Sequence, residues 1–151
     1  NVDAAIIFKN DDLLKKHESR ITLAAALNTV SQDIYDCSRA IASTENNRVS
    51  IDIADLRDNL TGILYPGVGH SKERLLDAAN QAVEELKKSL PGTSGKRCLF
   101  WSFEIPVNNA TAENIEVASR LIAEAFPQFE KRLFKVIERP NATEATAVII
   151  A

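Results

Sequence analysis

The sequence predicts an α/β (α+β) domain, with a four-stranded mixed sheet, two covering helices and a long N-terminal helix. Short apolar runs bounded by Gly, Pro and Asn alternate with segments whose apolar residues recur every three or four positions. The chain of 151 residues is long enough to bury one core. Its 45% hydrophobic and 26% charged residues, with a net charge of −3, exclude a disordered tail.

The longest element is a helix predicted over residues 20–44. Apolar residues repeat in it at alternating steps of four and three, which places them on one helical stripe: Leu23, Leu27, Val30, Ile34, Cys37 and Ile41. At 1.5 Å per residue this helix is on the order of 37 Å long. We therefore expect it to connect two bodies and to cover one face of the sheet.

The other elements follow from apolar runs and capping residues. A strand over residues 2–8 and a short helix over 12–16 precede the long helix. Residues 45–51 break the pattern, and Asp52 then caps a short helix that ends before Gly62. The remaining predictions are strands at 63–69, 97–106, 132–139 and 144–151, and helices at 72–90 and 111–126, capped by Ser71 and Thr111.

Composition excludes several classes of function. A slight acidic excess gives no electrostatic footprint for nucleic acid. No apolar run approaches the roughly 18 residues that span a bilayer, so we expect no membrane insertion. The two cysteines, Cys37 and Cys98, do not form a metal-binding pair and fit a reducing, cytoplasmic compartment. Neither they nor the two histidines have the spacing of a metal site, so no metal ligand is predicted.

Three local features are candidates for a site. Asp52 and Asp55 stand one helical turn apart at a helix start, where they either stabilise the helix N-terminus or act in catalysis. Asn28 lies inside the long helix, either as a solvent-facing residue or as a hydrogen-bonding group on the helix wall. Gly67 and Gly69 precede a helix, and we interpret them as a turn with positive φ rather than as an anion site.

The chain contains no methionine, begins inside one apolar run and ends inside another. We therefore expect it to be a fragment of a longer polypeptide.

Several segments, taken together, indicate a protein family more specifically than any one of them does alone. They are residues 7–14 (IFKNDDLL), Leu27-Asn28, residues 49–56 (VSIDIADL), Asn59-Leu60 with Tyr65-Pro66, and the Gly67-Val68-Gly69 stretch with Glu73-Arg74, Asp77-Ala78-Ala79 and Ala82. In this order and spacing they resemble the tubulin/FtsZ superfamily over nearly the whole chain. The resemblance implies that residues 1–19 end a nucleotide-binding domain, 20–48 form the core helix and linker, and 49–151 form the C-terminal domain.

The resemblance also implies a function. Subunits of this superfamily stack head to tail into filaments, and the loop after the core helix enters the GTP site of the next subunit. Asp52 and Asp55 would then be the catalytic carboxylates facing the neighbour's γ-phosphate, and Asn28 and Ser50 would contact the nucleotide. GTP and Mg²⁺ would be held mainly by an N-terminal domain with a glycine-rich phosphate loop.

Two departures from the family pattern motivate an alternative. Ser50 stands where the family has asparagine, and Asn47 stands where it has glycine. The alternative is therefore a non-catalytic paralogue that polymerises or forms a scaffold without hydrolysis. A third hypothesis is an unrelated α/β enzyme or ligand-binding domain, with a pocket between the sheet and the long helix.

Overall fold

The computed structural model describes residues 4–8, 22–43, 47–92 and 98–151, and the structural statements below concern these residues. In chain order the elements are β1 (Ala4–Ile6), α2 (Leu23–Ala42), β2 (Asn47–Val49), α3 (Ile53–Asn59), β3 (Gly62–Leu64), β4 (Pro66–Ser71), α4 (Leu75–Ser89), β5 (Cys98–Pro106), a 3-10 turn (Val107–Asn109), α5 (Ala112–Ala125), β6 (Lys131–Arg139) and β7 (Ala145–Ile150). The predicted helix at 12–16 lies outside the described residues.

The main sheet is mixed, as predicted, but it has five strands rather than four. Its order is β2-β6-β5-β7-β4, with β5 and β6 parallel and the other neighbours antiparallel. The extra strand is β2, in a segment predicted only to break the helical pattern. Its three residues, Asn-Arg-Val, carry no strand periodicity of their own, and they are ordered by pairing with β6.

The predicted strand at 63–69 is in fact two strands that belong to different sheets. Its first part, β3, pairs in parallel with β1, and Ala4 lies opposite Gly62. Its second part, β4, is an edge strand of the main sheet and pairs with β7. Pro66, which has no backbone N–H, starts this edge strand, where a missing donor is tolerated.

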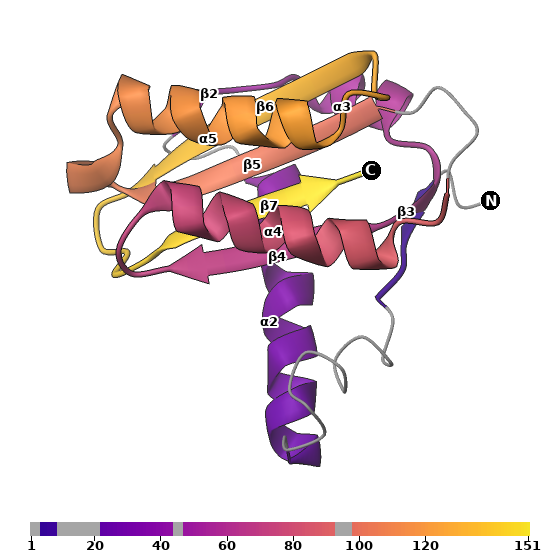
Figure 1. The fold of residues 1–151 in the computed structure, drawn as a ribbon, viewed down its shortest axis with the longest axis horizontal. Coiled ribbons are helices and arrows are strands. Elements are labelled where there is room, and N and C mark those ends of the chain that lie inside the picture. The colour runs from indigo at the N-terminus through magenta and orange to yellow at the C-terminus, as the bar shows by residue number, and fades with distance from the viewer. Residues whose placement is uncertain (1–3, 9–21, 44–46, 93–97) are drawn as a thin grey trace.

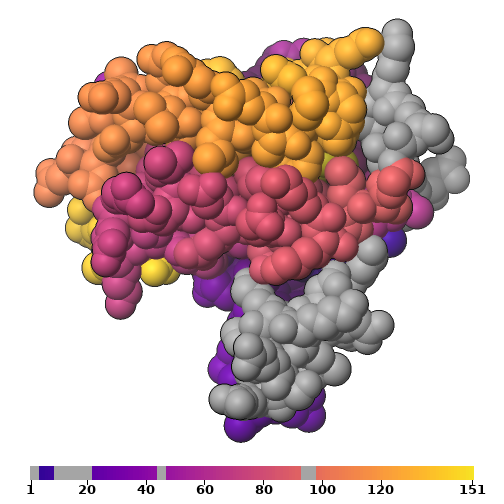
Figure 2. All heavy atoms as spheres, in the orientation of Figure 1, coloured from indigo at the N-terminus to yellow at the C-terminus, as the bar shows by residue number. Residues whose placement is uncertain are grey.

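Helices α4 and α5 cover one face of the main sheet, as the sequence predicts (Figure 1). Their atoms form a continuous layer over that face (Figure 2). Thr111 caps α5 through a hydrogen bond from the Asn114 N–H, as predicted. The prediction that Ser71 caps α4 is wrong, because α4 begins only at Leu75 and its N-cap residue is Arg74. The Ser71 hydroxyl instead accepts hydrogen bonds from the N–H groups of Glu73 and Arg74, in the turn ahead of the helix. The core beneath them is an apolar cluster that includes Leu86, Leu99, Trp101, Phe103, Ile122, Val136 and Ile149.

The opposite face is covered by the C-terminal half of α2 together with α3. Cys37 and Ala40 of α2 are buried against Phe100, Val148 and Ile150 of the sheet. The long helix therefore covers this face, as predicted, but only with its last turns.

The N-terminal half of α2 protrudes from the body of the domain (Figure 1). The predicted apolar stripe is accordingly buried only in part. Cys37 is 2% exposed, whereas Leu23 is 77% exposed and Leu27 is 58% exposed. Periodicity predicts which face of a helix is apolar, but not how far along the helix a partner extends.

Gly67 and Gly69 do not form a positive-φ turn, so that interpretation is wrong. Both lie inside β4, and the only described glycine with positive φ is Gly62. They face α4 so closely that a Cβ on Gly69 would lie 2.1 Å from the Ala78 carbonyl oxygen. These glycines are required by close helix–strand packing.

Candidate functional site

The segment of residues 50–55 connects β2 to α3 and lies on the surface of the domain. The side chains of Ser50, Asp52 and Asp55 are all exposed. Only the partly buried Ile51 packs inward in this stretch, against the core beneath α2. The carboxylates predicted for catalysis are therefore accessible to another molecule.

Asp52 and Asp55 are not equivalent. Asp52 is the N-cap of α3, and its Oδ1 accepts a hydrogen bond from the Ala54 N–H at 2.9 Å. The capping role considered from the sequence is thus confirmed for Asp52. Asp55 lies in the first turn, and its carboxylate has no hydrogen-bond or ion-pair partner among the described residues. Asp55 is therefore the carboxylate with more capacity to accept hydrogen bonds from a water molecule.

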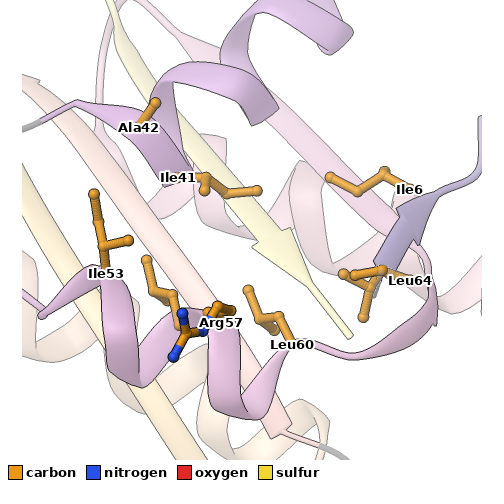
Figure 3. Close-up of a pocket in the computed structure, with 9 residues that line it drawn as sticks. Ile6, Ile41, Ala42, Ile53, Arg57, Leu60 and Leu64 are labelled. Atoms are coloured by element: carbon orange, nitrogen blue, oxygen red, sulfur yellow. The ribbon is translucent and has the colours of Figure 1, made fainter. Parts of the chain in front are cut away.

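The short helix α3 is held by its apolar side. Leu56 and Leu60 are buried, and Ile53 is 57% exposed. Together with Ile6, Ile41 and Leu64 these side chains line a cavity of about 360 Å³ beneath the helix, and Arg57 stands at its edge (Figure 3). The third sequence hypothesis placed a pocket between the long helix and the sheet. This cavity instead lies between the end of α2, α3 and the β1–β3 pair.

Asn28 lies far from these carboxylates. It is exposed on the protruding half of α2, whereas residues 50–55 follow the opposite end of that helix (Figure 1). The 14 steps from Asn28 to Ala42 correspond to roughly 21 Å along the helix axis. The structure thus brings Ser50, Asp52 and Asp55 together in one segment and leaves Asn28 at the other end of the long helix.

A polar cluster that is buried at Lys135 and partly buried at its other members joins α2 to the sheet, and sequence reasoning missed it. Arg39 of α2 and Arg139 of β6 both pair with Glu104 of β5, at 3.3 Å and 3.1 Å. Lys135 of β6 is 3% exposed, and its Nζ donates to the carbonyl oxygens of Ala40, at 3.2 Å, and of Ser43.

Burial shifts the acid–base properties of this cluster. It raises the pKa of Glu104, against the opposing effect of Arg39. It lowers the pKa of Lys135, against the opposing effect of Glu104. The cluster could have been suspected from β6, where Lys135 shares a strand face with Leu133 and Ile137.

The described residues carry neither a metal cluster nor a membrane span. In that part of the chain, no three His, Cys, Asp or Glu side chains are grouped so as to hold a metal ion. Within those same residues, no helix has both the length and the hydropathy to cross a membrane. The thiols of Cys37 and Cys98 are free and buried.

No protein-family model and no curated protein matches the chain by sequence. Solved structures do match it in fold. An FtsZ dimer from M. jannaschii superposes with a TM-score of 0.73 at 15% identity, over 99% of this chain and 45% of that one. CetZ1 from Haloferax volcanii, solved as a GDP-bound monomer, gives a TM-score of 0.63 at 15% identity, over 99% of this chain and 45% of that one.

CetZ from Methanosaeta thermophila gives a TM-score of 0.68 at 14% identity, over 100% of this chain and 43% of that one. The resemblance to the tubulin/FtsZ superfamily is therefore confirmed at the level of the fold. The chain spans less than half the length of each of these proteins.

Proposed function

We propose that this chain is part of a filament-forming cytoplasmic GTPase, and that its residues 50–55 complete the GTP site of an adjacent subunit. The observation that carries the proposal is the carboxylate of Asp55, which is exposed and has no partner among the described residues. It stands in the first turn of α3, the helix that follows α2 and β2, on a fold shared with FtsZ and CetZ. Among these similar proteins, one was solved as a dimer and one with GDP bound.

The placement of the candidate residues supports a head-to-tail arrangement. Asn28 lies in the protruding half of α2 and Asp55 lies in α3, beyond the other end of that helix, so one subunit cannot place both at a single nucleotide. In a stack of identical subunits, Asn28 contacts the guanine base bound to its own subunit, while residues 50–55 reach the nucleotide of the neighbour. Assembly and hydrolysis are then linked, because neither subunit alone has a complete site.

The chemistry of the segment fits one part of such a site. A carboxylate accepts hydrogen bonds, so Asp55 can orient and polarise the water that attacks the γ-phosphate. Asp52 holds the first turn of α3 in place and adds a second negative charge, and Ser50 offers a hydroxyl beside them. Carboxylates repel phosphate, so the phosphates and Mg²⁺ are held mainly by residues outside this chain.

The test uses Asp55→Ala in a protein that contains this chain and assembles with GTP. We expect the variant to form filaments and to release phosphate at least about tenfold more slowly per assembled subunit, because water positioning is lost. Asp58→Ala, an exposed carboxylate one turn further along α3, is the matched control and should behave as wild type. Wild-type phosphate release from Asp55→Ala filaments would refute the assignment.

The non-catalytic alternative is supported by one feature. Asn47, which replaces the family's glycine, is fixed in β2, where it pairs with Ile137 and donates through Nδ2 to the Ser43 carbonyl at 3.4 Å. This fixes the chain just before Ser50. Filaments with the same lifetime in GTP and in a non-hydrolysable analogue would favour the alternative.

A further inference from the structure

Strand β6 holds the chain on both sides of the connection that leads to residues 50–55. On one side, the Nζ of Lys135 donates to the carbonyl oxygens of Ala40 and Ser43 at the end of α2. On the other side, β2 pairs with the next residues of β6, with Val49 opposite Val136. A single strand therefore fixes where α2 ends and where the site segment begins.

The chemistry of Lys135 suits the end of a helix. The last carbonyl groups of a helix have no N–H partner within it, and they carry the negative end of the helix dipole. The α2 helix supplies one bond itself, from the Ser43 N–H to the Arg39 carbonyl. The buried ammonium of Lys135 adds two further donors and a positive charge at the same place.

A second anchor lies next to the first and restrains β2. Arg48 of β2 pairs with Glu138 of β6 at 2.9 Å, and it also donates to the carbonyl oxygen of Ala110. Its side chain is 46% exposed, so this anchor is weaker than the buried one. Lys135, together with the ion pair between Arg39 and Glu104, thus ties the C-terminal end of α2 to the sheet.

We propose that Lys135 is a positioning residue for the site segment: it fixes the end of α2, and through β2 it sets where Asp52 and Asp55 stand relative to the neighbouring subunit. Lys135 is buried and does not touch the nucleotide. This inference rests on the proposed function.

The experiment compares Lys135→Met with Lys131→Met in the protein that assembles with GTP. Both lysines lie on β6, but Lys131 is exposed, so it controls for loss of a lysine on this strand. For Lys135→Met we expect phosphate release per assembled subunit to fall about tenfold, because misplaced catalytic groups lose rate steeply. The critical concentration for assembly should stay within about threefold of wild type, because Lys135 itself is buried and most residues of an interface contribute little to its binding energy. Lys131→Met should match wild type in both measurements.

A second readout separates positioning from general instability. Amide hydrogen exchange of the unassembled protein should speed up in residues 43–60 of Lys135→Met and stay unchanged in β5 and β7. The inference would be overturned if Lys135→Met showed the same phosphate release and the same amide hydrogen exchange as Lys131→Met. Faster exchange throughout the protein would overturn it too, because Lys135 would then be only structural. A wild-type protein without GTP hydrolysis would instead refute the proposed function, and the exchange pattern would still test the role of Lys135.

Removing Lys135 alone leaves Glu104 with less compensating charge, which can prevent folding. The double variant Lys135→Met/Glu104→Gln removes both charges and is compared with Glu104→Gln alone. We expect the double variant to release phosphate about tenfold more slowly than Glu104→Gln. Equal turnover in the two folded variants would overturn the inference.

Discussion

The carboxylate of Asp36 on α2 lies 3.3 Å from the imidazole of His70 on β4, so a charged side chain of the long helix is buried against the sheet. Asp36 is only 6% exposed, and its other oxygen accepts a hydrogen bond from Gln32 at 3.0 Å. On its far side, His70 lies 3.6 Å from Glu144 and 3.3 Å from the Thr146 hydroxyl. The contact between α2 and the sheet is therefore polar on this side and apolar around Cys37.

This burial predicts how stability depends on pH. Burial raises the pKa of Asp36, and His70, Gln32 and Arg39 offset this only in part. As pH falls, a carboxyl whose pKa is higher in the folded state takes up its proton at a higher pH when the protein is folded than when it is unfolded. The free energy of unfolding therefore increases as pH falls. The free energy of unfolding of wild type, minus that of Asp36→Asn, should therefore increase from about pH 7.5 down to about pH 4.5.

Urea denaturation at several pH values measures this difference. Asp58→Asn, which replaces an exposed carboxylate, is the control and should show no such increase. A difference between wild type and Asp36→Asn that shrinks toward acidic pH would contradict the burial argument.

The close approach of α4 to β4 predicts a large effect at Gly69. A Cβ there would lie 2.1 Å from a backbone carbonyl oxygen, which cannot move without shifting α4. Gly69→Ala should therefore lower the free energy of unfolding by about 3 kcal/mol. Gly92→Ala is the matched control, because nothing lies within 4 Å of the position that its added methyl carbon would occupy, and it should change stability by less than about 0.5 kcal/mol. Equal stability of the two variants would contradict the packing described here.

The buried thiol of Cys37 predicts slow alkylation. Burial raises its pKa to about 12, and Asp33 and Asp36 add to the shift. Because the thiolate is the reactive form, iodoacetamide at about pH 8 should modify Cys37 at least about a hundredfold more slowly in the folded protein than in urea. Mass spectrometry of the two cysteine peptides measures each rate separately. Rapid modification of Cys37 in the folded protein would show that α2 does not stay packed on the sheet.

The sequence predicts the layers of this fold because its helices and long strands carry strong local signals. The helix α5 has Thr111 as its cap and an apolar face, and β5 alternates between the two sheet faces, with Phe103 on one and Glu104 on the other. The pairing of β1 with β3 and the added strand β2 could not be predicted, since strands of three residues have no periodicity to detect.

The candidate site, like the fold, was predicted only where the sequence carries a local signal. Asp52 and Asp55 stand out because a helix start has a recognisable local pattern, and their exposure agrees with the predicted role. The buried charges of Asp36, Glu104 and Lys135 depend on where α2 packs against three strands distant in sequence. No local pattern encodes that contact for Asp36 and Glu104, and the only local signal for Lys135 is its place on one strand face with Leu133 and Ile137.

The central claim is that Asp55 of one subunit acts on the GTP of another. Its most direct test mixes two variants of the assembling protein: Asp55→Ala, and a second variant that retains Asp52 and Asp55 but cannot bind GTP. Each variant alone should release phosphate slowly. If the site is shared, their mixed filaments will regain phosphate release, because GTP bound by an Asp55→Ala subunit can meet the intact Asp55 of a neighbour of the second variant. Mixed filaments as inactive as either variant alone would contradict the account.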